Sequence, residues 1–178
     1  MFNRLRAWRL VGVCAAVLLG TLVAAPIVAA AQPDKLVLGT PGPIVNPAGQ
    51  PCAVQVNFDP IEIKRTIFTF ENGTEFVKFK GYGTLSNPAS GASFLHHVVG
   101  HQITTFDEVA NEYVVAYQGQ FGIRLYAGDV GPWGVVDEPG LFLRITGRAE
   151  QTFDGDTFAS TSFSYTGTYI DICAVLAS

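Results

Sequence analysis

The chain has 178 residues, of which 48% are hydrophobic, and its 11 basic and 15 acidic side chains give a formal net charge of −4 at neutral pH. This acidic balance argues against nucleic-acid binding, which needs a concentrated basic patch that the short clusters Lys64-Arg65 and Lys78/Lys80 do not supply.

Residues 1–31 have the pattern of a secretory signal peptide. The basic start MFNRLRAWR precedes the apolar run LVGVCAAVLLGTLVAAPIVAA, and Ala29-Ala30-Ala31 offers small residues for cleavage. Cleavage removes three arginines and no acid, which leaves 8 basic and 15 acidic residues and a net charge of −7. We therefore expect a secreted, extracellular protein with no membrane span in its mature form. A retained membrane anchor is the alternative, because the apolar run is long enough to cross a bilayer.

Residues 32–51 contain five prolines and three glycines, and we interpret them as an extended N-terminal arm. The β-domain then covers 52–178. It begins with Cys52 and carries Cys173 near its end, and an even number of cysteines in an exported chain indicates a disulfide. A pair of buried free thiols is the alternative.

The domain reads as successive strands. Cys52 to Asp59 alternates, and IEIKRTIFTFE leads into Asn72-Gly73, a strong hairpin signal before the return strand TEFVKFKGYGTL. Strands are also expected over 92–106, over YVVAYQ and FGIRLYA as a pair turning at Gln118-Gly119-Gln120, over LFLRITGRAEQTF, and from residue 157 to the end after a turn at Asp154-Gly155-Asp156. No segment after residue 31 shows a helical stripe.

We therefore predict an all-β fold, a small antiparallel up-and-down β-barrel of about eight strands. Closure would remove exposed strand edges, and a Cys52–Cys173 bond would bring the first and last strands side by side. A β-sandwich is the alternative fold.

Alternation places one set of apolar side chains inside this barrel. The inward residues include Val77 and Phe79 on one strand, and on the others Phe121, Ile123, Leu125, Leu141, Leu143 and Ile145. The interior is either packed solid or hollow. In the hollow case the candidate ligand contacts are the loop residue Trp133, the aromatic side chains Phe121, Phe163, Tyr165 and Tyr169, and the histidine His97.

The three histidines lie together in SFLHHVVGHQIT but do not form a metal site by themselves. On a strand His97 and His101 stand roughly 13 Å apart, and His96 and His97 point to opposite faces. One zinc ion holds its imidazole nitrogens at about 2 Å, so this motif alone cannot coordinate it. We expect no metal and no cofactor. A histidine facing the lumen beside a carboxylate would suit general-base chemistry.

The segments PCAVQVNF and DICAVLAS, together with the signal peptide and the Asn-Gly hairpin, resemble small secreted proteins of actinobacteria that have no assigned activity. The resemblance implies paired cysteines and an eight-strand barrel, and it carries over no functional residue. At the level of fold alone the chain is similar to lipocalin-like carriers and to the allene oxide cyclase and dirigent barrels.

Three functions follow as hypotheses. The protein binds a small hydrophobic ligand or a component of the cell envelope. Alternatively, it is a cyclase- or isomerase-like enzyme that uses a lumenal histidine or glutamate. In the third hypothesis it is a surface interaction module without a pocket.

Overall fold

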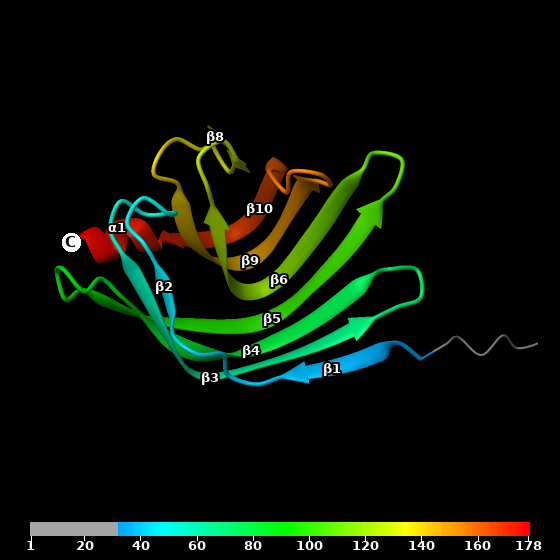
Figure 1. The fold of residues 1–178 in the computed structure, drawn as a ribbon, viewed down its shortest axis with the longest axis horizontal. Helices are drawn as coiled ribbons and strands as arrows, with labels where there is room; N and C mark the ends of the chain where they lie inside the picture. Colours follow the sequence, from blue (N-terminus) through cyan, green and yellow to red (C-terminus); the bar gives the residue numbers. More distant parts are fainter. Residues whose placement is uncertain (1–31) are drawn as a thin grey trace, which may run out of the picture. The chain divides into compact units, whose positions relative to one another are not determined.

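The strands follow one another in an antiparallel meander that curves into a trough (Figure 1). The structure is a computed structural model and describes residues 32–178; the predicted signal peptide lies outside the described residues. The elements are β1 (Asp34–Leu38), β2 (Ile44–Asn46), β3 (Val56–Thr69), β4 (Glu75–Ser86), β5 (Ser93–Asp107), β6 (Glu112–Leu125), β7 (Val130–Gly131), β8 (Gly134–Val135), β9 (Leu141–Asp154), β10 (Ser160–Asp171) and α1 (Ile172–Ala177).

The main sheet is open. Its order is β1-β3-β4-β5-β6-β9-β10, with β2 also paired to β3, and β7 and β8 form a separate two-stranded ribbon. This confirms an all-β antiparallel fold with eight strands in one sheet. The described strands do not close into a barrel, because β10 pairs with β9 alone. The N-terminal arm supplies β1 and β2, which pair with the two ends of β3.

The two hairpins with strong turn signals form as predicted. Asn72 accepts a hydrogen bond from the Thr74 amide between β3 and β4. Asp154 accepts hydrogen bonds from the amides of Asp156 and Thr157 between β9 and β10. These side chains stabilise the turns in the way that makes Asn and Asp common there.

The turn predicted at Gln118-Gly119-Gln120 is wrong, because β6 runs without interruption through these residues. Gly119 instead belongs to a row of four glycines on adjacent strands, Gly100, Gly119, Gly147 and Gly167, which face one another in register. All four have φ between 122° and 158°. A Cβ on any of them would meet the backbone of the neighbouring strand. Four adjacent strands therefore share one row that only glycine fits, which suits a sharply curved sheet.

The sequence predicts no helix after residue 31, but the structure has the short helix α1 after β10. Asp171 caps it by accepting a hydrogen bond from the Ala174 amide, while Ile172 and Leu176, four residues apart, are fully buried. Six residues are too few to show a helical stripe in the sequence.

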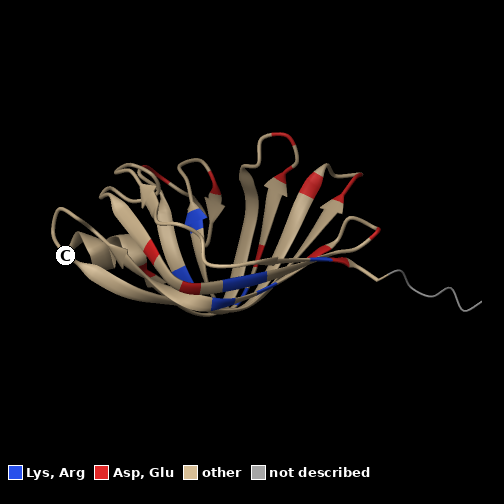
Figure 2. Ribbon diagram, turned by 60° about the horizontal axis from the view of Figure 1, so that its bottom comes forward, with Lys and Arg blue, Asp and Glu red and all other residues tan. Residues whose placement is uncertain are grey.

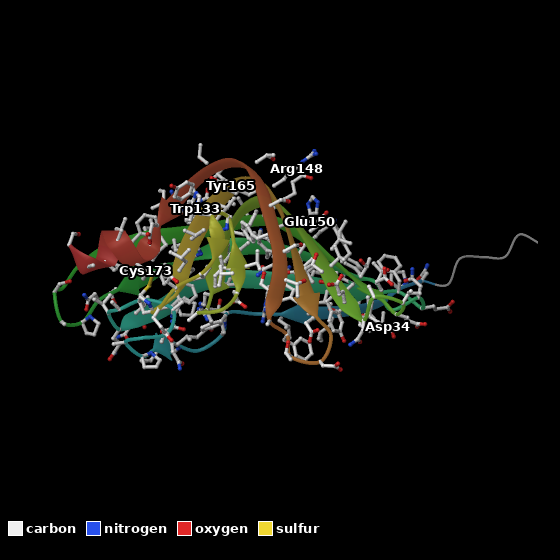
Figure 3. The ribbon with its side chains drawn as sticks, turned by 90° about the horizontal axis from the view of Figure 1, so that it is seen from above. Asp34, Trp133, Arg148, Glu150, Tyr165 and Cys173 are labelled. Carbon is white, nitrogen blue, oxygen red and sulfur yellow. A yellow bond between two sulfur atoms is a disulfide. The ribbon has the colours of Figure 1, made fainter. Side chains whose placement is uncertain are left out.

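The predicted disulfide is present, and it joins Cys52, just before β3, to Cys173 in α1, with their Cα atoms 5.2 Å apart. It does not lie between paired strands, as barrel closure would require. The bond instead links the segment just before β3 to the helix that follows β10. Figure 3 shows Cys173 in α1 near one end of the trough and Asp34 of β1 near the other.

Two apolar clusters form the core. The first lies in the hollow of the curved strands, where the predicted inward residues Phe121, Ile123, Leu125, Leu143 and Ile145 are all buried. Val136, from the loop that carries β7 and β8, packs onto this cluster. The second cluster lies near α1 and joins Cys52, Val56, Phe58, Leu85, Phe142, Ile172 and Leu176. Within residues 32–178 no helix is long and apolar enough to cross a bilayer.

A candidate ligand-binding cavity on the trough

A cavity of about 480 Å³ lies among the strands of the main sheet. Its walls come from β3, β4, β5, β6 and the start of β9, with Pro41 and Ile44 of the arm at one side. Most of the wall is apolar and includes Phe58, Ile63, Phe79, Leu85, Val98, Phe121 and Phe142. The polar side chains that reach it are Arg65, His96, Gln102, Tyr117 and Arg124.

The cavity exists because the sheet splits between β5 and β6. These strands pair from Val99 to Asp107 on one side and from Glu112 to Gln120 on the other. Before Val99, β5 pairs only with β4, and after Gln120, β6 pairs only with β9. Phe121 and Arg124 are three residues apart and so point to opposite faces of β6, yet both line the cavity. The split therefore lets side chains from both faces of the sheet meet in one space.

His96 of β5 lies in this split and is 5% exposed. Its ring lies 6.2 Å from the ring of Phe58 and 6.1 Å from that of Phe142, measured between centroids. The neighbouring residue on β6 is Gly122, where a Cβ would come within 3.1 Å of Nε2 of His96. Glycine at position 122 thus leaves the imidazole room at the cavity wall.

The charge around His96 is entirely basic. Burial, together with the nearby charges of Arg144, Arg124 and His97, lowers the pKa of His96 from 6.5 to about 4. The imidazole is therefore neutral at pH 7. No aspartate or glutamate is among the described residues that line the cavity.

The guanidinium groups of the two arginines nearest His96, Arg124 and Arg144, each stack on an aromatic ring. The guanidinium of Arg124 lies 5.3 Å from the Phe142 ring centroid, and that of Arg144 lies 4.7 Å from the Phe94 centroid. Such stacking orients a guanidinium while leaving its N–H edge available. Within the described chain, Nδ1 of His96 and Nε of Arg144 are both buried without a hydrogen-bond partner.

Of the six predicted ligand contacts, the structure places Phe121 in this cavity, where its ring stacks on Tyr117 at 5.0 Å. Four others form a separate chain of aromatic rings near β10, with Trp133 5.1 Å from Tyr169, Tyr169 5.9 Å from Tyr165, and Tyr165 6.3 Å from Phe163. Figure 3 shows Trp133 and Tyr165 on this side of the sheet. Trp133 is 60% exposed. None of the four lines the cavity.

The sixth contact, His97, lies on the face of β5 opposite to His96 and stacks on Tyr82 at 5.7 Å. His101 is on that outer face too, 5.4 Å from Phe76. The three imidazoles therefore do not converge. In the described part of the chain no group of three or more histidine, cysteine, aspartate and glutamate residues is arranged to hold a metal ion.

The sequence did not point to Arg65, Arg124, Phe142 or the special position of His96. Arg124 and Arg144 alternate with apolar residues and read as solvent-facing, and Phe142 shares that face. The split sheet brings this face against β5, and a strand pattern cannot report such a split. The one available signal was Gly122, a residue without a side chain between two inward apolar positions.

No protein-family model, curated protein or solved structure matches the chain.

Proposed function

We propose that this is a secreted, disulfide-stapled β-sheet protein that binds a small apolar ligand in the cavity between β3, β5 and β6. The observation that carries the proposal is the cavity itself. Its volume of about 480 Å³ lies in the range of roughly 300–1,000 Å³ typical of small-molecule sites. Its wall is mainly aliphatic and aromatic with a few polar groups, which is the usual composition of such sites.

Two features support export. The start of the chain has the signal-peptide pattern, and the Cys52–Cys173 bond suits an oxidising compartment. We also propose that the meander is an incomplete up-and-down barrel. Its strands follow one another in chain order from β3 to β6 and then through β9 to β10. An open trough gives a ligand a direct route to the cavity.

Binding fits the cavity better than the other two functions. The cavity does contain a neutral histidine, as a lumenal general base requires, but no carboxylate lines the wall to orient it. A surface module without a pocket leaves the open apolar wall unexplained, since exposed apolar surface of this kind usually marks a binding site.

The test uses Nile red, an uncharged apolar dye, as the probe. Val98 lines the cavity, and the next residue, Val99, lies on the opposite face of β5 and is 56% exposed. We expect the purified protein to bind Nile red with increased fluorescence, Val98→Trp to weaken binding at least tenfold, and Val99→Trp to leave it unchanged. Equal binding by both variants, or no binding by the unsubstituted protein, would contradict the proposal.

A further inference from the structure

We propose that the ligand is an anionic amphiphile, a single apolar chain ending in a carboxylate or phosphate, with Arg124 binding its acidic group. This inference rests on the proposed function and adds the chemical class of the ligand. Its evidence is the charge of the cavity wall, the unpartnered polar atoms around His96, and the way the rings hold the guanidinium groups.

The charge of the cavity is opposite to that of the chain. Acidic residues outnumber basic ones by 15 to 11 in the whole sequence. The cavity nevertheless presents two arginines and no acid. Figure 2 shows most Lys and Arg along the middle of the strands, while many Asp and Glu lie at strand ends and turns. A local positive site on an acidic protein favours a negatively charged ligand group.

Buried polar atoms at the site lack partners. His96 is about 95% buried and lines the cavity, and its Nδ1 makes no hydrogen bond within the described chain. Beside it, Nε of Arg144 is also buried and makes no hydrogen bond within the described chain. Most buried polar atoms in folded proteins are hydrogen-bonded, and an orphaned one is costly. A neutral imidazole carries one N–H that can donate to an anionic oxygen. The positive charge at the cavity wall therefore comes from the arginines and not from His96.

The position of Arg124 suits a head group at the split and a chain along the trough. Arg124 is stacked on Phe142, so its planar edge can take two oxygens of one carboxylate or phosphate. Arg65 lies on β3 opposite Phe79 of β4, in register with the part of the sheet where β5 and β6 remain paired, and so away from the split. Between β3 and β6 the wall is apolar, with Ile63, Phe79 and Val98 in position to contact an alkyl chain.

The experiment measures displacement of Nile red by three ligands with the same chain: dodecanoate, dodecyl phosphate and dodecanol, each below its micelle concentration. We expect at least one anionic ligand to bind ten times or more tightly than dodecanol. Arg124→Gln should weaken the anion about tenfold or more and leave dodecanol within twofold, because charge-assisted hydrogen bonds are about twice as strong as neutral ones. Arg124→Lys should lose less, since it keeps the charge.

The matched control is Arg148→Gln on β9, an exposed arginine that does not line the cavity, and it should change nothing. Arg124→Met, which also removes the charge, gives a second variant if Arg124→Gln binds no Nile red. Equal affinity for dodecanol and both anions, or an equal loss with Arg148→Gln, would overturn the inference while the proposed function stands. Failure of Nile red and all three ligands to bind would overturn both. Tighter binding of dodecyl phosphate than of dodecanoate supports the inference and identifies the head group as phosphate.

Discussion

Breaking the Cys52–Cys173 bond should cost about 5 kcal/mol of unfolding free energy. The bond closes a loop with a sequence separation of 121 residues. In the chain-entropy account such a loop restricts the unfolded chain by roughly 16 cal/mol/K, or about 4.9 kcal/mol at 25 °C. Since domains of this size are stable by only about 5–15 kcal/mol, a third or more of the stability depends on one bond. The open sheet makes the bond more important, because no strand pairing joins β10 back to β3.

The assay is urea unfolding followed by far-ultraviolet circular dichroism. The oxidised protein is compared with the same protein in reductant, which removes the bond without removing atoms. The double variant Cys52→Ala/Cys173→Ala should be destabilised slightly more, because Cys52 is fully buried and its truncation leaves a void. A loss below about 1 kcal/mol in reductant would refute the reasoning and show that packing around α1 alone holds the helix to the segment before β3.

Two further predictions concern single residues. The pKa of His96 is about 4 in the folded chain against an ordinary 6.5, so as the pH falls the unfolded chain binds this proton before the folded chain does. The free energy of unfolding therefore decreases by about 3 kcal/mol in total as the pH falls from 6.5 towards 4. His96→Gln should flatten this part of the pH dependence of urea unfolding, and a parallel curve would contradict it. Gly147→Ala should cost more than about 2 kcal/mol, because its φ is 142° and its Cβ would overlap the Thr166 carbonyl. Gly128→Ala, at φ 91° with no atom within 4 Å, should cost only about 1 kcal/mol, and equal losses in thermal unfolding would exclude crowding as the cause.

Local chemistry made much of the fold predictable. Asn72-Gly73 and Asp154-Gly155-Asp156 fix their turns through side-chain hydrogen bonds that involve only neighbouring residues. Alternation along β6 and β9 identified the core of the trough, and the paired cysteines identified the disulfide.

What could not be predicted depends on contacts between distant strands. Gly119 looks like a turn residue in the sequence, but its role comes from Gly100 and Gly147 on the neighbouring strands. The burial of His96 follows from the split between β5 and β6, which places it between Phe58 and Phe142. No periodicity records such a split, and the candidate site could therefore be only partly identified.

Native mass spectrometry tests the ligand-binding cavity most directly, on purified protein before and after denaturation. We predict that the native protein carries an additional mass that is lost on denaturation, that Val98→Trp lacks it, and that Val99→Trp retains it. An unliganded mass for all three proteins, at concentrations where Nile red also fails to bind, would contradict a ligand-binding cavity between β3, β5 and β6.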